Sequence, residues 1–462
     1  MAVTSDRRTV DRPVVRITDR RAEVGPTLES PVPQNLSFLD QLGLWGNLGV
    51  SLLGFTGALF VLFPTNRALS FAAALTAVVL GTALGTAVLA ASTVPGARTG
   101  VPAMMLLRGL FGGRLSYLPT VLNVLQCLGW GTFEIVTIAT AAHTVADWAP
   151  RWICVLVAGA ITTALTIKPL GAIRVLRKYV TVLMVAAVLY LLVQLLRHPL
   201  PSLTAGTWSG FWLATDQVVA VAVSFVPLAA DYSRHSRTQR GAFAGAFVGY
   251  GITQVLCYGL GLLTLVTVAT GKNPNIYGAF IAVPVGWLAF AVLALRELDQ
   301  SFANVYSTAV SVQNLRPRWD RRLLAVFIGV VTTVTALFTD LGGYQNFLVL
   351  LGAVFVPLGG VLLVDFFLLS GDTWDYAAAS PARWSRIVPW VAGVVAYQLI
   401  NPGYISWWVS GWQHVDRWLG FAPPDWLSAS ITSFVVAAAL TPVCATAARM
   451  TRRRRRHAAH AA

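Results

Sequence analysis

The sequence predicts an all-α integral membrane protein with twelve transmembrane helices, and three observations carry this prediction. Of the 462 residues, 56% are hydrophobic and only 11% are charged, with a mean hydropathy of +0.66, whereas soluble domains have about 25% charged residues. Apolar runs of about 20 residues, enough to cross a bilayer, follow one another. Basic residues gather in alternate loops. This composition excludes a soluble enzyme, a secreted disulfide scaffold and a nucleic-acid-binding module as the main class.

The membrane segments begin after a polar N-terminal tail. Residues 1–38 are rich in arginine and proline and lack the apolar core and cleavage site of a signal peptide, so we expect a disordered cytoplasmic tail. Apolar runs place the twelve spans at 42–63, 70–94, 117–142, 152–167, 176–196, 211–230, 241–269, 281–311, 323–339, 345–369, 386–401 and 425–447. The transmembrane domain thus covers 39–447, and a basic cytoplasmic tail follows over 448–462.

Loop charges set the orientation of the spans, because cytoplasmic loops are rich in lysine and arginine. With both termini in the cytoplasm, the basic residues of the outer loops are only Arg67, Arg151, Arg197, Lys272 and Arg417, out of 34 in the chain. The net charge of +15 therefore needs no nucleic-acid partner, and the arginine run at 452–456 is interpreted as a topology anchor on anionic lipid. We predict a multi-pass protein of the cell membrane. Its oligomeric state stays open, a monomer included.

Cysteine and histidine spacings indicate neither a metal site nor an enzyme. The four cysteines have no C-x-x-C spacing and lie in apolar stretches, as buried small hydrophobes do; they are Cys127, Cys154, Cys257 and Cys444. The sequence contains no H-E-x-x-H or G-x-S-x-G motif. No metal, no organic cofactor and no enzymatic activity are therefore expected.

Polar residues inside the predicted spans are the candidate functional residues, because an ionisable group at bilayer depth costs at least about 2.5 kcal/mol unless it is paired or hydrated. In the third span, Gln126, Trp130 and Glu134 recur at every fourth position and share one helix face. This face offers an amide, an aromatic plane and a carboxyl group to a binding site. The alternative is that Glu134 only pairs with a basic neighbour and Trp130 only packs in the core.

The eighth span has the densest polarity, with Arg296, Glu297, Asp299, Gln300 and Asn304 in apolar sequence. Glu297 and Asn304 share a helix face, and Asp299 lies nearly opposite Glu297. One carboxylate is expected to form a structural pair with Arg296 or another helix, and the other to face a cavity. The sequence leaves open which carboxylate does which.

Two predicted spans contain signals of a broken helix. The first has polar Asn47 and Ser51 among glycines. These glycines are Gly43, Gly46, Gly49, Gly54 and Gly57. In the sixth span Ser224, a substrate-binding candidate, and Phe225 precede Pro227, which lacks an N–H and frees a carbonyl oxygen about four residues earlier. Such interruptions in two halves indicate a secondary transporter's binding site. Close packing of small residues is the alternative for the first span.

Four stretches together resemble the nucleobase:cation symporter family, which includes the purine and cytosine permeases and their hydantoin, allantoin and uracil relatives. They are "GVPAMMLLRGLFGGRLSYLPTVLNVLQCLGWGTFE" (100–134), "PLAADYSRH" (227–235), "ANVYSTAVSVQNL" (303–315) and "NFLVLLGAVFVPLGGVLLVDFFLL" (346–369). The resemblance runs from about residue 35 to 370. The last two helices match only in number and placement.

The resemblance implies two inverted five-helix repeats, helices 1–5 and 6–10, plus two extra helices, with helices 1 and 6 broken at the substrate. It also implies that a flat heterocycle stacks on Trp130 and is capped by Phe225. Asn304 corresponds to the family's substrate-binding asparagine of helix 8. Glu134 stands where the family usually has an amide, and this departure bears on the choice of substrate.

The coupling ion follows less directly from the resemblance. Sodium-driven relatives hold the ion between carbonyl groups of broken helix 1, here near Gly46 and Gly49, and hydroxyls of helix 8. The corresponding helix 8 positions are Leu298 and Asp299. Asp299 is expected either to ligate sodium with the helix 1 carbonyls or to carry a proton. The ion is thus H+ or Na+; we favour H+, with Glu134, Glu297 and Asp299 as the candidate carriers.

The predicted function is symport of a nucleobase or related planar heterocycle, with cytosine or a purine favoured. Stacking tolerates many rings, so hydrogen bonds at the edge of the ring must determine the substrate specificity. A carboxylate accepts a hydrogen bond from an exocyclic amine such as cytosine N4. A thiamine-precursor aminopyrimidine, allantoin or hydantoin is the alternative substrate. A channel would need polarity along a whole pore, whereas polarity here clusters at mid-depth. Only flux measurements would separate a nontransporting receptor from a transporter.

Overall fold

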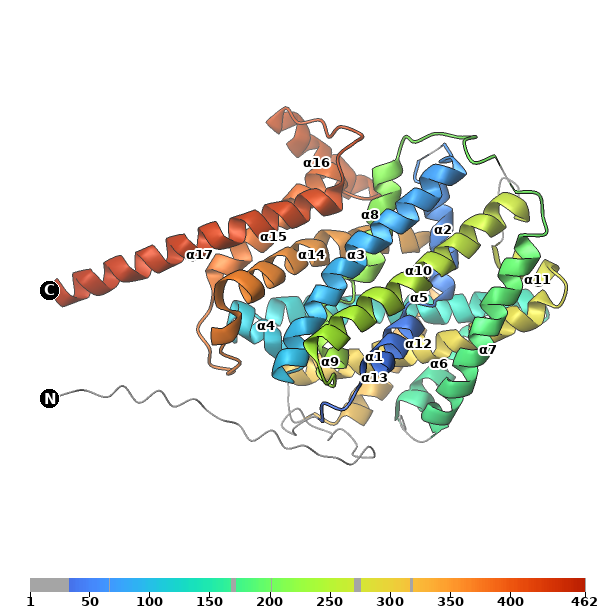
Figure 1. Cartoon of the computed structure of the whole chain (residues 1–462), viewed down its shortest axis with the longest axis horizontal. Helices are drawn as coiled ribbons and strands as arrows, with labels where there is room; N and C mark the ends of the chain where they lie inside the picture. The colour runs from blue at the N-terminus through green and yellow to red at the C-terminus, as the bar shows by residue number, and fades with distance from the viewer. Residues whose placement is uncertain are drawn as a thin grey trace.

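Helices form at each apolar segment that the sequence predicts to span the membrane (Figure 1). The computed structural model describes residues 33–65, 67–167, 172–200, 202–269, 276–315 and 319–461. Across these residues, β-structure is limited to two isolated bridges, Leu36 with Ser236 and Leu69 with Thr207. Six described helices are long and apolar enough to cross a membrane, or seven if one bent pair counts as a span. The predicted all-α membrane fold is confirmed.

Most of the predicted spans are single helices. They are α3 (Phe71–Thr99), α5 (Tyr117–Val145), α6 (Arg151–Ile167), α7 (Ala172–Leu195), α10 (Gln239–Thr267), α12 (Gly286–Leu315), α13 (Arg321–Leu337), α14 (Tyr344–Val364), α15 (Trp384–Ile400) and α17 (Ala429–Ala461). Hydroxyl side chains begin several of them, because a helix leaves its first N–H groups without partners. Ser70 accepts from the Ala73 N–H at the start of α3 (3.2 Å), and Thr238 from the Gly241 N–H at the start of α10 (3.0 Å).

The first span is broken into α1 (Phe38–Leu48) and α2 (Leu52–Leu62), which are bent by 60°. Gly49 lies in the break, and a Cβ there would come within 2.2 Å of Thr253 Oγ1 and 2.9 Å of the Tyr250 carbonyl oxygen on α10. On α10 itself, a Cβ at Gly249 would come within 2.5 Å of the Leu42 carbonyl oxygen of α1. The glycines therefore serve both the break and the close packing of α1 on α10.

The sixth span is interrupted more gently. α8 (Phe211–Val223) is followed by a 3₁₀ turn, η1 (Val226–Leu228), and by α9 (Ala229–Ser233), and the segment 211–233 still counts as one span. In the turn, the Leu228 N–H donates to the Phe225 carbonyl (2.9 Å), so the Ser224 carbonyl loses its helical donor. The interruption predicted at Pro227 thus takes the form of a tight turn.

The helices pack in two main groups. α1, α2, α8 and α9 pack on α3 and α10, which lie side by side (Figure 1), whereas α5 and α12 pack on each other and on α6 and α13. α14 lies against α8, and α15 and α17 pack beside α14. Only narrow contacts join α2 to α5 and to α12. The α1–α2 break therefore lies at the boundary between the groups.

Some helices differ from the sequence prediction. Additional short elements are α4 (Ala103–Phe111), α11 (Ile276–Ala282), α16 (Ser406–Leu419), η2 (Leu341–Gly343), η3 (Asp365–Ser370) and η4 (Gly371–Thr373). α12 begins five residues after the predicted 281, because Pro284 and the positive φ of Val285 (53°) separate it from α11. α17 continues to Ala461 instead of ending near 447, as its alanine and arginine content favours.

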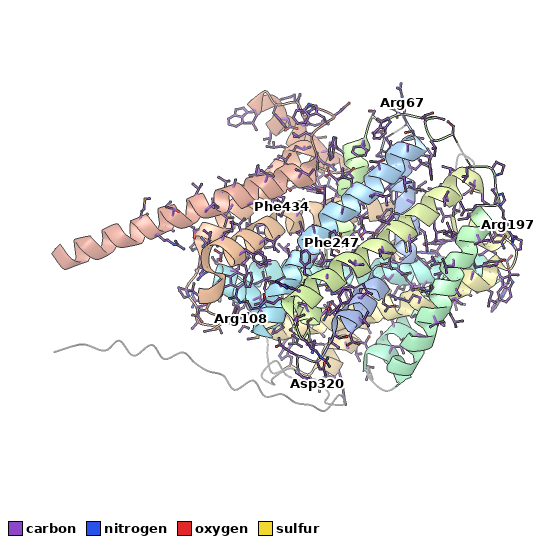
Figure 2. The ribbon with its side chains drawn as sticks, viewed as in Figure 1. Arg67, Arg108, Arg197, Phe247, Asp320 and Phe434 are labelled. Carbon is purple, nitrogen blue, oxygen red and sulfur yellow. The ribbon has the colours of Figure 1, made fainter. Side chains whose placement is uncertain are left out.

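The charged ends of the molecule agree with the predicted loop sides. Figure 2 shows Arg67 and Arg197, both from predicted outer loops, toward one end of the long helices α3 and α10. It shows Arg108 and Asp320, from predicted inner loops, toward the other end, and Phe247 on α10 between them. Phe243 and Phe247 stack with ring centroids 6.1 Å apart on the exposed face of α10, as suits contact with lipid.

Asp216 of α8 fixes the start of α17. Its carboxylate is 1% exposed and accepts hydrogen bonds from Ser428 Oγ (2.5 Å) and from the N–H groups of Ala429 (2.8 Å) and Ser430 (3.1 Å). A carboxylate at a helix N-terminus is favoured by the helix dipole as well as by these bonds. The last helix is thereby attached to the interrupted sixth span.

Asp216→Ala is expected to lower the melting temperature of the purified protein. The substitution leaves N–H groups at the start of α17 buried without an acceptor, at a cost of about 2 kcal/mol. Asp425→Ala is the matched control, since Asp425 is exposed in the segment before α17, and it should leave the melting temperature unchanged. Equal melting temperatures for the two variants would contradict the attachment.

Candidate functional site

A cavity lies where the α1–α2 break meets α5, α8, α10, α12 and α14. Its lining residues come from all six of these elements: Leu48, Gly49, Ser51, Leu53, Gly54, Trp130, Glu134, Val221, Phe225, Tyr250, Gln254, Cys257, Tyr258, Gln300, Asn304 and Tyr344. The cavity volume is about 20 Å³, enough for about one ordered water. The lining side chains must therefore move apart when a larger molecule enters.

Helix α5 contributes Trp130 and Glu134 to one wall of the cavity, one helical turn apart. The Trp130 ring meets Phe347 at a centroid distance of 5.2 Å and an angle of 79°, and Tyr344 at 6.0 Å and 66°. Such near-perpendicular ring contacts are favourable and fix the plane of the indole. The wall thus offers a flat aromatic surface held in a set orientation.

Glu134 and Asn304 meet across the boundary between α5 and α12. Asn304 Nδ2 donates to Glu134 Oε1 (2.7 Å). Both residues are buried, with Asn304 6% and Glu134 1% exposed. Glu134 Oε2 has no hydrogen-bond partner among the described residues. Glu134, which lines the cavity, therefore has one carboxylate oxygen that accepts no hydrogen bond from the described residues.

Phe225 lines the cavity from the interruption in the sixth span. Its ring contacts Tyr250 of α10 (centroids 5.4 Å apart, 64°) and Trp45 of α1 (6.2 Å, 81°). Because Phe225 precedes η1, its position depends on the local turn and not on a continuous helix. The structure thus brings Phe225, Trp130, Glu134 and Asn304 to one cavity.

Gln126 and Ser224 lie next to this cavity but not in its lining. Gln126 Nε2 donates to the Ser224 carbonyl (2.8 Å) and to Asn123 Oδ1 (2.8 Å), and Ser224 Oγ donates to the Val221 carbonyl (2.7 Å). Gln126 therefore satisfies the carbonyl that the 3₁₀ turn leaves without a helical donor. Gln126 thus holds the backbone at Ser224, the residue directly before Phe225.

Glu297 of α12 binds the start of α2. Glu297 Oε1 accepts from Ser51 Oγ (2.7 Å), and Oε2 accepts from the Leu52 N–H (2.9 Å). The carboxylate is fully buried and is not part of the cavity lining. Of the two carboxylates predicted on this span, Glu297 thus makes a structural contact, while the side chain of Asp299 lies outside the described residues.

Arg296 and Gln300 bind the end of α1. Arg296 donates to the Asn47 carbonyl and to Gln300 Oε1 (3.1 Å), and Gln300 Nε2 donates to the Leu48 carbonyl (2.8 Å). The carbonyl groups of the first break thus receive side-chain donors from α12. Of the two glycines predicted near an ion, Gly49 lines the cavity and Gly46 packs on Gly249 of α10.

Glu134 differs from the other buried carboxylates of the described chain. Asp216, Asp231 and Glu297 each accept N–H groups at the start of another helix: α17 for Asp216, α4 for Asp231 through the Ala103 N–H (2.9 Å), and α2 for Glu297. Asp365 pairs with Arg386 and accepts from Trp374 Nε1 (2.7 Å). Glu134 receives only the Asn304 amide, and of these five described carboxylates it alone lines the cavity.

The seventh span supplies lining residues that the sequence analysis missed. Tyr250, Gln254 and Tyr258 recur at every fourth position of α10, the same stripe pattern that singled out the third span. Gln254 Oε1, Tyr258 Oη and Tyr344 Oη have no hydrogen-bond partner among the residues described. Together with Glu134, these residues line the cavity and carry polar groups that have no partner among the described residues.

Known proteins resemble the chain in sequence and fold. Residues 55–379 match the model of a family described as permeases for cytosine/purines, uracil, thiamine and allantoin. The chain is 24% identical over 443 residues to the purine-uracil permease NCS1 of Arabidopsis thaliana, covering 81% of this chain and 70% of that protein. It is also 24% identical over 400 residues to the purine-cytosine permease FCY21 of Saccharomyces cerevisiae, covering 78% and 74%.

Among solved structures, the chain is similar to MHP1, a nucleobase-cation-symport-1 family transporter, in a closed conformation with bromovinylhydantoin bound. The TM-score is 0.74 at 16% identity, and the match covers 93% of this chain and 96% of that chain. The inward-facing conformation of MHP1 gives a TM-score of 0.71, also at 16% identity. At this level of identity the similarity shows a shared fold.

Proposed function

Since the chain belongs to the family of permeases for cytosine/purines, uracil, thiamine and allantoin, we propose that it is a secondary active symporter that imports a nucleobase or related planar heterocycle together with H+. As a family member it is a membrane permease and not an enzyme. Cytosine or a purine is the proposed cargo. The observation that carries this proposal is the cavity in which Trp130, Phe225, Glu134 and Asn304 meet.

The cavity chemistry supports a flat ring with donors on its edge. Trp130 and Phe225 offer aromatic surfaces, and base-on-aromatic stacking contributes about 1–3 kcal/mol per base. Asn304 Nδ2 donates to Glu134 Oε1. The acceptors that have no hydrogen-bond partner among the described residues are Glu134 Oε2 and Gln254 Oε1. Acceptors in the site favour an exocyclic amine or ring N–H, as in cytosine or adenine, over the acceptor-rich edge of uracil.

Other ring donors satisfy the same acceptors. A thiamine-precursor aminopyrimidine carries an exocyclic amine, and allantoin or hydantoin carries amide N–H groups. The family description names thiamine and allantoin, and bromovinylhydantoin is bound in the MHP1 structure. These rings are therefore the second candidate substrates.

Proton coupling is supported by the position of Glu134. A carboxyl group that lines the cavity can bind the coupled proton, and once protonated it still has acceptor capacity for a ring N–H or amine. Glu297 is occupied by Ser51 and the Leu52 N–H, which makes it a weaker carrier than Glu134. Asp299 remains a proposed third carrier. No organic cofactor enters this mechanism, since an ion gradient supplies its energy.

Alternating access is proposed to proceed by rocking of α1, α2, α8 and their partners against α5, α12 and theirs. The packing supports two inverted repeats within twelve spans. α1 packs on α10 as α8 packs on α3, and α5 packs on α13 as α12 packs on α6. Each pair turns into the other when a helix of the first repeat is replaced by the one five spans later, and a helix of the second repeat by the one five spans earlier, in the predicted order.

The proposed domain organisation places this machinery at residues 39–447 in the cell membrane. The tails at 1–38 and 448–462 are proposed to lie in the cytoplasm, where the basic C-terminal run contacts anionic lipid. The proposal involves no nucleic acid, and a monomer contains the complete cavity. Membrane lipid and the small heterocycle are the proposed partners.

Uptake into proteoliposomes tests this function. Labelled cytosine, adenine, hypoxanthine, uracil, allantoin and hydroxymethyl-aminopyrimidine are offered with a proton gradient or with a sodium gradient. We expect accumulation of an amino-substituted ring driven by the proton gradient. Failure to accumulate any ring, with protein shown to be folded, would contradict the proposed cargo class and point to a different substrate for Glu134.

A further inference from the structure

The break between α1 and α2 meets complementary charges on α12. A helix has partial negative charge at its carboxyl end and partial positive charge at its amino end. Arg296 and Gln300 donate to the carbonyl groups at the end of α1, whereas Glu297 accepts from the N–H at the start of α2. The carboxyl end of α1 therefore meets hydrogen-bond donors, one of them a cation, and the amino end of α2 meets a carboxylate.

Arg296 supplies the positive charge of this arrangement. Its side chain is 1% exposed, donates to the Asn47 carbonyl, and also donates to Gln300 Oε1 (3.1 Å). Gln300 is thereby oriented so that its Nε2 donates to the Leu48 carbonyl (2.8 Å). Because arginine stays protonated in proteins, the carbonyl end of α1 faces a permanent cation.

Transporters commonly use such unwound carbonyl groups to coordinate a coupling metal ion. Here a metal cation at the Asn47 and Leu48 carbonyls would compete with the Arg296 and Gln300 donors and would lie close to a like charge. The side of the break toward α10 offers little room, since even a Cβ at Gly49 would approach Thr253 Oγ1 to 2.2 Å. The Asn47 and Leu48 carbonyls at the break are thus bound by the protein's own donors.

We propose that Arg296, oriented by Gln300, acts as a fixed cation at the α1–α2 break in place of a coupling metal ion, so that this protein binds no sodium there and transports without it. The part concerning transport rests on the proposed symport function. The part concerning sodium binding does not, because it requires no substrate. Arg296 is accordingly a residue that determines ion specificity.

Two measurements on the purified full-length protein test the inference directly. Radioactive sodium binding is measured by equilibrium dialysis, and the melting temperature is compared in sodium chloride and choline chloride at equal ionic strength. We expect no saturable sodium binding and no shift between the salts. Saturable sodium binding to the wild-type protein, with a matching rise in melting temperature, would overturn the inference.

Two substitutions at the same position separate charge from side-chain size. Arg296→Gln removes the cation beside the Asn47 carbonyl and Glu297, so its melting temperature should fall in choline chloride and rise on addition of sodium chloride. Arg296→Lys keeps the charge and should not respond to sodium. If the Arg296→Gln protein folds and sodium chloride changes its melting temperature no more than that of the wild type, the inference is overturned. If Arg296→Gln does not fold, the wild-type binding measurement decides.

Uptake distinguishes this inference from the proposed function. With a proton gradient present, heterocycle uptake should be equal in sodium chloride and choline chloride. Uptake that requires sodium overturns the inference and leaves the symport function standing. No uptake in either salt contradicts the proposed function, and the sodium-binding result then still decides the role of Arg296.

Discussion

Trp130→Ala is expected to abolish heterocycle uptake into proteoliposomes. The substitution removes the aromatic surface on which the ring stacks, and stacking of about 1–3 kcal/mol corresponds to a loss of affinity of about 5- to 160-fold. It also removes the ring against which Phe347 and Tyr344 pack, so the remaining wall loses its shape. Initial uptake rates measured over a range of substrate concentrations check this expectation.

The matched control is Trp152→Ala on α6. Trp152 is 57% exposed and contributes nothing to the cavity lining, so uptake should stay at the wild-type level. Substrate-dependent stabilisation provides a second readout, since a ligand raises the melting temperature only of a protein that binds it. Equal loss of uptake in both variants would indicate a folding defect and remove the support for Trp130 as the stacking surface.

Glu134→Gln is expected to change both substrate preference and pH dependence. The amide keeps the shape of the side chain but donates as well as accepts, so the preference should move from cytosine toward uracil. The amide also binds no proton. Wild-type uptake should therefore rise as the external pH falls, whereas uptake by the variant should no longer follow the pH. Cytosine and uracil uptake, measured side by side across a pH series, tests both expectations.

Glu297→Gln provides the comparison with the same chemical change at a capping position. An amide there replaces part of the acceptor that holds Ser51 Oγ and the Leu52 N–H. The melting temperature of Glu297→Gln should therefore fall by more than that of Glu134→Gln. If Glu134→Gln alters neither substrate preference nor pH dependence, Glu134 has a structural role and the proposed coupling through it is wrong.

The sequence predicted the all-α membrane fold because hydropathy and loop charge act along the chain itself. It also indicated the first break, where Asn47, Ser51 and the glycines interrupt apolar sequence. The form of the second interruption was not predictable in the same way. Pro227 shows that a helical hydrogen bond is lost, but the 3₁₀ turn and the help from Gln126 depend on packing against α5.

The candidate site shows the same division. Helical spacing placed Trp130 and Glu134 on one face, and both line the cavity. Spacing does not identify which backbone groups of another helix a side chain will meet, so the contact of Glu297 with α2 and that of Gln126 with Ser224 had no sequence signal. The α10 stripe did have one, because Tyr250, Gln254 and Tyr258 share a face inside an apolar span.

The contact of Glu297 with Ser51 and the Leu52 N–H has a geometric consequence for the transport cycle. It joins α12 to α2 across the boundary between the two helix groups, where other contacts are few. When one helix group rotates against the other, only points on the rotation axis keep their distances. If the Glu297 contact persists through the cycle, it therefore lies on that axis and acts as the pivot. Spin-label distances across this contact should stay constant while those at the helix ends change with substrate. Rotation of the two helix groups about this contact would then open the two ends of the cavity in turn.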